Sequence, residues 1–356
     1  CWGSGEDGQL GNGIMESSSN IPQKVAPPQG TSAALSFTQL VAASETFCGL
    51  DKNSLIYCWG DGMNGQIGNG AKNSVAIPTL VSGNLKFSML LEAGTNTFCA
   101  KSTSNYIYCW GINTHGEAGI GSTQNMEITV PTQIAMAQGK YVKLNALTAT
   151  DGNFCGFDST YIYCWGRGNS GQIGNGLTYD QAGPTQIKYS YVPTSLPTSI
   201  IGNQYSLCTL INSRAYCWGY GLDGEMGNNT TMQKNPFASA VTMPTNGDLF
   251  KSISATTSSF CALSTNGLIY CWGNGWYGQM GNNNEDNNLT PSVVSYANPT
   301  FASDTAAITK IVGAGDTFCA LNSQGHVYCW GYGLNGETAQ GVEQNTESPT
   351  PIMFNY

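Results

Sequence analysis

Hydrophobic residues along the chain fall in short runs, such as FTQLVA at 37–42 and FKSISA at 250–255, which are separated by turns rich in Gly, Asn, Ser and Pro. Within these runs apolar and polar residues tend to alternate, as they do in a β-strand with one buried face. No segment sustains the 3.6-residue spacing of an amphipathic helix. The pattern therefore predicts an all-β chain with almost no helix.

The chain is built from a repeat. The tripeptide Cys-Trp-Gly occurs seven times at intervals of 51 to 58 residues, with its cysteine at Cys1, Cys58, Cys109, Cys164, Cys217, Cys271 and Cys329. Each copy is followed by a glycine-rich turn close to GxGxxGQxGN and then by a Pro-led segment, such as PQKV at 22–25 or PTLV at 78–81. A period of this length is typical of stacked β-repeats. We therefore expect one domain over residues 1–356, with four short strands in each repeat.

Six further cysteines lie nine or ten residues before a Cys-Trp-Gly cysteine. If Cys155 faces Cys164 across an antiparallel hairpin, Ser159 and Thr160 remain as a two-residue loop. A spacing of ten leaves a three-residue loop, and three of these four loops end in Asn or Gly, which accept a left-handed conformation. Both spacings keep one register. We therefore predict six hairpin disulfides, Cys48–Cys58, Cys99–Cys109, Cys155–Cys164, Cys208–Cys217, Cys261–Cys271 and Cys319–Cys329.

Both faces of each hairpin are apolar. In the hairpin of residues 47–59, alternation places Cys48, Leu50, Ile56 and Cys58 on one face and Phe47, Gly49, Tyr57 and Trp59 on the other. We expect the small residue at the Gly49 position to face the wall formed by Tyr57 and Trp59. A sheet that is apolar on both faces must be covered on both, as in a β-propeller. We predict a seven-bladed propeller of four-stranded antiparallel blades, one of them incomplete; an open β-solenoid is the alternative.

The residues from Phe318 to Gly336 and the turn Gly65-Gln66-Ile67-Gly68 together carry the pattern FCAL…YCWG-x-G-x-x-GQ-x-G. This pattern resembles the repeat of the regulator of chromosome condensation family, which are seven-bladed propellers with a G-x-x-G-Q-L-G signature. The paired cysteines depart from the nuclear member and are similar to the extracellular repeats of crinkly-type receptor kinases. Secreted propellers such as a bacterial β-lactamase inhibitor share the architecture. The resemblance implies the fold and no activity.

One repeat lacks a strand. There are seven Cys-Trp-Gly segments but only six with the preceding FC or LC cysteine, so Cys1 has no hairpin partner. We expect the missing strand to come from residues before Cys1, from residues after Tyr356, or from another molecule by strand complementation. Cys1 is therefore expected to be free or bonded to a cysteine outside residues 1–356.

The charge and the apolar runs exclude several classes of partner. A net charge of −9 with scattered Lys and Arg does not fit binding to a phosphate backbone, so we expect no nucleic acid partner. No apolar run reaches the length of about 18 residues that a membrane helix needs, so these residues are not expected to insert into a membrane. Turns such as GDGMNG at 60–65 fit a dinucleotide-binding pattern, but that fingerprint must open a helix. We predict no cofactor.

The chain has few residues suited to binding a metal or to catalysis. The chain contains two histidines, His115 and His326, and no CxxC, so we predict no metal site. Carboxylate pairs such as Glu6–Asp7 and Glu285–Asp286 are interpreted as solvated loop charges. Because no nucleophile stands beside a recognisable base, we expect a protein that is not an enzyme. A site in a propeller's central channel is the alternative.

Two features suggest surface contacts outside the cell. Glycosylation sequons begin at Asn228, Asn229 and Asn288, and persistent disulfides indicate an oxidising, extracellular location. Trp276 and Tyr277 occupy turn positions that are Glu-Asp, Met-Asn, Asn-Ser or Leu-Asp in other repeats, and large aromatics on a loop are typical binding anchors. Packing of these two rings on a neighbouring blade is the alternative.

Taken together, these features predict a non-catalytic, secreted or cell-surface propeller with an interaction or structural role. Its expected partners are proteins, glycans or further copies in a larger extracellular assembly or filament. A ligand-recognising receptor ectodomain or a secreted inhibitor is the alternative function.

Overall fold

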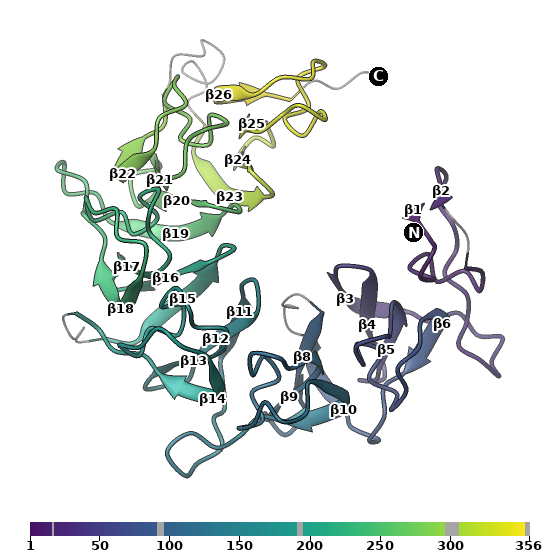
Figure 1. Ribbon diagram of the computed structural model, residues 1–356. Coiled ribbons are helices and arrows are strands. Elements are labelled where there is room, and N and C mark those ends of the chain that lie inside the picture. The colour runs from purple at the N-terminus through teal and green to yellow at the C-terminus, as the bar shows by residue number, and fades with distance from the viewer. Residues whose placement is uncertain (16–17, 91–95, 191–194, 296–305, 353–356) are drawn as a thin grey trace. The chain divides into compact units, whose positions relative to one another are not determined.

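The computed structural model describes residues 1–356 except 16–17, 91–95, 191–194, 296–305 and 353–356. The chain divides into two compact units, residues 1–168 with 179–186 and residues 169–178 with 187–356, which we call unit 1 and unit 2. The described residues form strands and turns and no helix, so they contain no helical membrane span (Figure 1). The all-β prediction is confirmed, and the single domain over 1–356 stays a prediction.

In its described residues, unit 1 contains one two-stranded sheet and three four-stranded sheets, each antiparallel and ordered along the chain. Its strands are β1 (Gly3–Ser4) and β2 (Ser18–Ser19); β3 (Phe37–Ala43), β4 (Thr46–Asp51), β5 (Ile56–Gly60) and β6 (Val75–Leu80); β7 (Phe87–Leu90), β8 (Thr97–Ser102), β9 (Ile107–Ile112) and β10 (Glu127–Gln133); and β11 (Ala146–Ala149), β12 (Asn153–Phe157), β13 (Ile162–Gly166) and β14 (Gln181–Gln186). We call each sheet a blade, numbered from blade 1 at β1–β2.

The described part of unit 2 holds three four-stranded sheets of the same kind, blades 5 to 7. Its strands are β15 (Pro197–Gly202), β16 (Ser206–Ile211), β17 (Arg214–Gly219) and β18 (Asn235–Ala240); β19 (Phe250–Ala255), β20 (Ser259–Ser264), β21 (Ile269–Gly273) and β22 (Asn288–Val293); and β23 (Ile308–Ala314), β24 (Thr317–Asn322), β25 (Val327–Gly331) and β26 (Thr346–Pro351).

The paired cysteines set the register of every four-stranded blade. In each blade the two cysteines oppose each other on the two central strands, with a Cα–Cα distance of 4.1 Å in all six disulfides. Asn212 and Ser213 form a two-residue loop and have positive φ angles of 51° and 59°. Ser54, which ends a three-residue loop, takes the same left-handed conformation at φ 67° although it is neither Gly nor Asn. The hairpin disulfides are confirmed.

The small residue at the Gly49 position is explained by the first strand of the blade. A Cβ atom on Gly49 would overlap the ring of Phe37 and lie 2.9 Å from Cδ2 of Leu40. Both neighbours come from β3, which pairs with one edge of β4, whereas β5 pairs with the other edge. Gly49 does face Tyr57 across the β4–β5 hairpin, as predicted. The side chains that limit its size, which the pattern did not predict, are those of β3.

Blade 1 differs from the prediction. The Pro-led segment 22–25 is not a strand, and the outer strand of this blade is the short β2 instead. Gln23 nevertheless exchanges two backbone hydrogen bonds with Cys1, in which the terminal amine donates at 2.9 Å and the Gln23 amide donates at 2.7 Å. Among the described residues, the sheet of blade 1 consists of β1 and β2 alone. A two-stranded ribbon without further strands is only marginally stable, so few residues of blade 1 form regular β-pairs.

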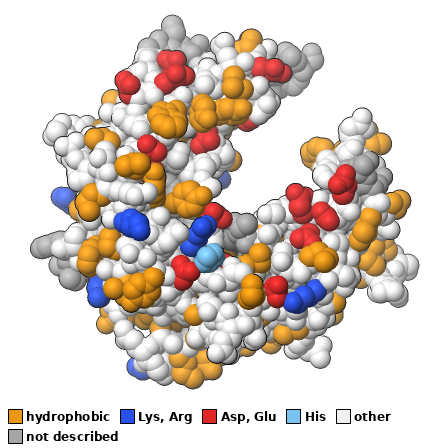
Figure 2. Space-filling view, viewed as in Figure 1, with side chains coloured by type: hydrophobic (Ala, Val, Ile, Leu, Met, Phe, Trp, Pro, Cys, Tyr) orange, Lys and Arg blue, Asp and Glu red, His pale blue; other side chains and the backbone are white. Residues whose placement is uncertain are grey.

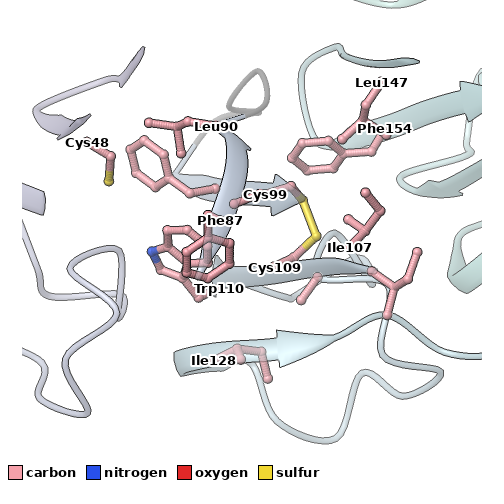
Figure 3. Packing of buried hydrophobic residues seen from close by; sticks show 14 of the residues in the cluster. Cys48, Phe87, Leu90, Cys99, Ile107, Cys109, Trp110, Ile128, Leu147 and Phe154 are labelled. Atoms are coloured by element: carbon pink, nitrogen blue, oxygen red, sulfur yellow. A yellow bond between two sulfur atoms is a disulfide. The ribbon is translucent and has the colours of Figure 1, made fainter. Parts of the chain in front are cut away.

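The core lies between blades as well as within them. Figure 3 shows Phe87 beside Trp110, with Cys48 of the preceding blade on one side and Phe154 and Leu147 of the following blade on the other. The tryptophans of the six disulfide-bonded Cys-Trp-Gly segments are at most 1% exposed: Trp59, Trp110, Trp165, Trp218, Trp272 and Trp330. Both hairpin faces are thus covered in blades 3 to 6, as the pattern predicted. Phe47 on one face of the blade 2 hairpin is half-buried, and Leu321 on one face of the blade 7 hairpin is 36% exposed.

Candidate protein-binding face

The glycine-rich turns hold the tryptophan of the next blade. In six blade pairs the indole Nε1 donates a hydrogen bond of 2.8 to 3.1 Å to the carbonyl oxygen of the Gln or Glu that follows the turn. The pairs are Trp59 with Gln9, Trp110 with Gln66, Trp165 with Glu117, Trp218 with Gln172, Trp272 with Glu225, and Trp330 with Gln279. The motif that fits a dinucleotide loop is thus a contact between blades, and no described copy opens a helix.

The side chain of the same Gln or Glu fixes the shape of the turn. The side-chain oxygen of Gln279 accepts a hydrogen bond of 2.8 Å from the amide of Tyr277, and that of Glu225 accepts one of 2.9 Å from Asp223. With the backbone fixed from inside, the first of the two central turn residues points outward. At this position Met63 is 61% exposed and Trp276 is also 61% exposed.

In unit 2 this outward position is apolar in three successive blades. Leu222 is 46%, Trp276 61% and Leu334 48% exposed. Tyr277 packs edge-on against Tyr332 of the next blade, with ring centroids 5.1 Å apart and an interplanar angle of 77°. We call Leu222, Trp276, Tyr277, Tyr332 and Leu334 the turn ridge. Figure 2 shows hydrophobic side chains flanked by acidic ones over the blades of β21 and β25.

Amide and carboxylate groups join the members of the turn ridge. Asp223, next to Leu222, accepts hydrogen bonds from Asn274 at 3.4 Å and from Asn287 at 3.1 Å, both on the blade of Trp276. The Asn274 side chain in turn accepts the amide proton of Trp276 at 3.1 Å. These contacts orient the turns before any ligand binds, which lowers the entropy cost of binding.

Two acidic residues beneath the turn ridge are shielded from solvent: Glu225 is buried and Asp316 is half-buried. Burial raises the pKa of Glu225 to about 8, although the backbone hydrogen bonds that it accepts lower it. Burial also raises the pKa of Asp316, whose backbone carbonyl accepts the amide proton of Tyr332 at 3.0 Å. The turn ridge is therefore an aromatic and aliphatic surface with acidic groups at its base.

The packing interpretation applies to Tyr277, and the binding of a partner by either ring stays a prediction. Tyr277 packs on the neighbouring blade, whereas Trp276 projects into solvent. Leu222 and Leu334 were not predicted as binding residues from their local sequence. Aligning the seven turns by their glycines would have found them, because both occupy the same position as Trp276.

The predicted glycosylation residues lie in two different settings. Asn229 is exposed in a turn, and the hydroxyl of Thr230 donates a hydrogen bond of 2.5 Å to the side chain of Asn228. Asn288 lies in β22, where its side-chain nitrogen donates to the carbonyl of Cys271 at 3.5 Å. Attachment of glycans at these three residues stays a prediction.

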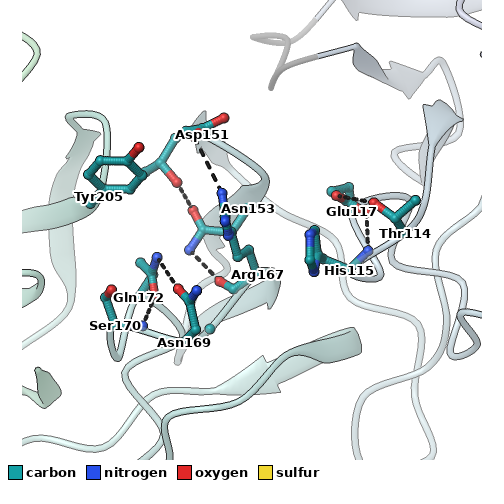
Figure 4. Close-up of polar contacts among 12 residues, drawn as sticks. Thr114, His115, Glu117, Asp151, Asn153, Arg167, Asn169, Ser170, Gln172 and Tyr205 are labelled. Carbon is teal, nitrogen blue, oxygen red and sulfur yellow. Dashed lines mark hydrogen bonds and ion pairs between the residues drawn. The ribbon is translucent and has the colours of Figure 1, made fainter.

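The polar groups considered for catalysis or metal binding form local pairs. His115 Nδ1 lies 2.7 Å from a carboxylate oxygen of Asp180, and its amide donates to Glu117 at 2.8 Å (Figure 4). Arg167 lies 3.5 Å from Asp151 in the separate group drawn in Figure 4. Among the described residues, no three His, Cys, Asp or Glu side chains gather as a metal site would require.

The remaining candidates also lie on the surface. His326 Nδ1 is 3.4 Å from the side-chain nitrogen of Asn322. Glu6, Glu285 and Asp286 are exposed, as expected for loop charges. Cys1 is half-buried and is a free cysteine.

Comparison with known proteins places this architecture in a family. The model for the Regulator of chromosome condensation (RCC1) repeat matches residues 1–50, 53–99, 161–197 and 266–321, more than half of the chain. The chain belongs to the RCC1 repeat family. A second RCC1 repeat model matches residues 250–279 and 308–337. The fold is accordingly a seven-bladed RCC1-type β-propeller, with six disulfide-bonded blades and a first blade of two described strands.

Two curated relatives match most of this chain. It is 25% identical to the ultraviolet-B receptor UVR8 of Arabidopsis thaliana over 359 residues, covering 99% of this chain and 76% of the receptor. It is 24% identical to the E3 ubiquitin-protein ligase HERC2 of Homo sapiens over 304 residues, 84% of this chain but only 6% of the ligase.

Two solved structures share the fold. Human WBSCR16 superimposes with a TM-score of 0.77 at 14% identity, covering 99% of this chain and 94% of that one. Yeast RCC1 (Prp20) superimposes with a TM-score of 0.72 at 17% identity, covering 99% of this chain and 83% of that one. At these identities the likeness concerns the fold alone.

Proposed function

We propose that this RCC1 family protein is a non-catalytic interaction module outside the reducing cytosol, and that the turn ridge of unit 2 binds a protein partner. The exposure of Trp276 carries the proposal. Trp276 is 61% exposed, so much of its apolar surface stays in contact with water, which is unfavourable unless a partner covers it. Buried aromatic anchors of this kind supply much of the binding energy in protein interfaces.

The relatives support protein binding as the general role. Yeast Prp20 has been solved bound to Kap60, and its binding to Gsp1p and histones has been described. HERC2 is a ligase, but this chain spans 6% of it, so the name supports no ligase activity here. The partner of this chain need not be any of these, because one fold serves many partners.

The location is proposed from the sulfur chemistry. Six disulfides, one in each complete blade, persist in an oxidising compartment and are rare in the cytosol. The exposed sequon at Asn229 agrees with a secreted or cell-surface protein. An acidic, disulfide-bonded chain of this kind is poorly suited to chromatin, and it suits an extracellular assembly, a receptor ectodomain or a secreted inhibitor.

The binding proposal is tested by a photo-cross-linking residue placed at Leu334, in protein added to the extracellular fraction of its source. We expect a discrete cross-linked product that becomes at least about tenfold weaker when Trp276 is changed to alanine. The same cross-linker at Met63, which is equally as exposed as Trp276 but lies in unit 1, is the matched control.

The identity of the product distinguishes the roles. A product made of two copies of this chain indicates a structural subunit that assembles with itself, whereas a second protein indicates recognition of a ligand. Equal products at Leu334 and Met63, or a product unaffected by Trp276→Ala, would rule out the turn ridge as the binding surface.

A further inference from the structure

An apolar groove lies in unit 1 between blade 1 and the first strands of blade 2. Its volume is about 380 Å³, and the residues that matter for its chemistry are Cys1, Phe37, Leu40, Val41, Phe47 and Trp59. Phe47 stacks on Trp59 with a centroid distance of 6.0 Å, and Phe37 packs tilted against the same ring at 5.6 Å. The groove is therefore walled by an ordered aromatic cluster of blade 2, with Cys1 on the other side.

The same surface is covered on the other blades. Leu40, which opposes the small residue Gly49, is 60% exposed. The residues that oppose the corresponding small position elsewhere are Leu90 at 4%, Leu147 at 9% and Ile311 at 9% exposure, with Ile200 and Ile253 half-buried. Phe47 is half-buried, whereas Phe98 and Phe154 at the equivalent position are fully buried. Blade 2 thus exposes a face that its counterparts bury.

The contact between blades 2 and 3 shows what covers this kind of face. There the disulfide side of β4, with Cys48 and Leu50, shares a buried cluster with Phe87 and Leu90 (Figure 3). The first strand of blade 2 also takes part, because the side chain of Gln39 accepts a hydrogen bond of 2.8 Å from the amide of Leu90. The cover is therefore a pair of strands, the first strand of a blade and its FC-type strand.

Cys1 stands where such a strand pair would join blade 1. The Cys1 backbone pairs with Gln23, as Cys58 pairs with Thr79 in blade 2. Cys1 is thus in the register of the Cys-Trp-Gly cysteines. The FC-type cysteines of the six complete blades are all bonded within their own hairpins, so none of them is available to Cys1.

We propose that this groove binds a strand pair of the repeat type whose inner strand reads aromatic–Cys–small–aliphatic, and that Cys1 forms a disulfide with its cysteine. The aliphatic residue two positions after that cysteine covers Leu40, as Leu50 covers the face of blade 3. The added strands pair with β1 through main-chain hydrogen bonds, which is recognition by strand addition. The groove contributes apolar burial, and the cysteine fixes the register.

The covalent step is a thiol–disulfide exchange. The Cys1 thiolate attacks the sulfur of a segment whose cysteine carries a small aromatic thiol as a mixed disulfide. One sulfur–sulfur bond forms and one breaks, the small thiolate leaves with the electron pair, and no further oxidant is needed. Docking in the groove places the two sulfurs together and so raises their effective concentration.

The test uses a synthetic peptide with the sequence of residues 37–51, FTQLVAASETFCGLD, its cysteine activated as that mixed disulfide. Release of the coloured thiol gives the rate, and intact mass gives the site. We expect the peptide to modify Cys1 at least about tenfold faster than a scrambled peptide with the same cysteine position. Cys1→Ser should give no adduct.

Two variants separate docking from simple thiol reactivity. Leu40→Glu places a charge in the groove and should reduce the rate to that of the scrambled peptide, and the residue is exposed enough for the variant to fold. Met63→Glu, a matched change on an exposed turn, should leave the rate unchanged. The proposal is overturned if the two peptides react at one rate, if Leu40→Glu has no effect, or if mild oxidation alone yields Cys1–Cys1 dimers that bury Leu40.

Discussion

Glu225 occupies a turn position at which four other repeats have glutamine, namely Gln9, Gln66, Gln172 and Gln279. Glu225 is 2% exposed, and it holds Trp272 through its carbonyl and the Asp223 amide through its side chain. Glutamine makes these contacts without a charge. A carboxylate in the same place must be desolvated, which is why burial raises the pKa of Glu225 to about 8.

We expect Glu225→Gln to stabilise the protein at pH 8 and to have little effect at pH 4.5. Between the ordinary pKa of 4.5 and the folded value of about 8, the folded state keeps a proton that the unfolded state has lost. Stability therefore falls as pH rises through this window, by at most about 1.4 kcal/mol per pH unit. Urea unfolding at several pH values measures the slope.

The matched control is Glu337→Gln, because Glu337 occupies the same turn position in blade 7 and is exposed. Desolvation raises the pKa of Glu337, but hydrogen bonds outweigh desolvation and lower the pKa overall, so its own contribution is lost only as pH falls below its ordinary pKa. This substitution should therefore leave the slope in the upper part of the window unchanged. A slope that is equal in the wild-type protein and in Glu225→Gln would show that the buried carboxyl does not titrate in this window.

The glycine at the end of each turn is a second position where one atom matters. Gly174 has a φ of 70°, and a Cβ there would lie 3.0 Å from the ring of Trp218. We expect Gly174→Ala to destabilise the protein by about 1–3 kcal/mol, because it adds backbone strain and displaces the indole from the carbonyl of Gln172. Chemical unfolding followed by tryptophan fluorescence measures both effects.

Gly325→Ala separates backbone strain from the blade contact. Gly325 has a φ of 90° but no atom within 4 Å of its would-be Cβ. Gly325→Ala should lower the free energy of unfolding by about 1–2 kcal/mol through backbone strain alone and leave the environment of the tryptophan indoles unchanged. If Gly325→Ala shifted the tryptophan emission as much as Gly174→Ala does, the contact between turn and tryptophan would not explain the motif.

At the scale of the element, the disulfide hairpin is the unit of stability. We expect Cys208→Ser with Cys217→Ser to lower the local stability of blade 5 by about 2–3 kcal/mol, since the bridge closes a loop of about ten residues. Hydrogen exchange should show lost protection in β16 and β17 and unchanged protection in β8 and β9, because in repeat proteins each unit contacts mainly its neighbours. Equal loss in both blades would contradict blade-by-blade stability.

The hairpins were also the most predictable part of the fold. Two cysteines at a spacing of nine or ten allow one register, and the loop residues Asn212 and Ser213 follow from it. The hairpin register predicts that Gly49 faces Tyr57, but not its neighbours on β3, because the pairing of β3 with β4 carries no cysteine to mark it. The short β2 in place of segment 22–25 depends on strand neighbours that local sequence does not encode.

The candidate binding face was predicted in part. Trp276 and Tyr277 stood out because aromatic residues are unusual in a glycine-rich turn. A leucine in a turn is not unusual, so Leu222 and Leu334 do not stand out in the sequence. They become candidates only because they occupy the same exposed turn position as Trp276 in neighbouring blades. A face assembled from equivalent positions of several repeats is a property of the fold, so single-residue reasoning finds only its most unusual member.

At the scale of the whole molecule, cysteine accounting gives a prediction about location. The chain has thirteen cysteines, of which twelve form disulfides and Cys1 is free. Protein isolated from its source with thiols blocked at once should therefore release twelve further thiols on reduction, or thirteen if Cys1 is bonded. Mass spectrometry after differential alkylation gives the count. Twelve or more thiols blocked before reduction would place the protein in a reducing compartment.

Every disulfide among the described residues closes within a single hairpin, so in this part of the chain no covalent link other than the backbone joins one blade to the next. Under tension the blades can separate while each bridge withholds the ten or so residues it encloses, a contour length of about 35 Å. A pulled molecule should therefore lengthen in six shortened steps, and adding a reductant under load should release the withheld lengths one bridge at a time. Such a chain tolerates stretching without losing the nuclei from which each blade refolds.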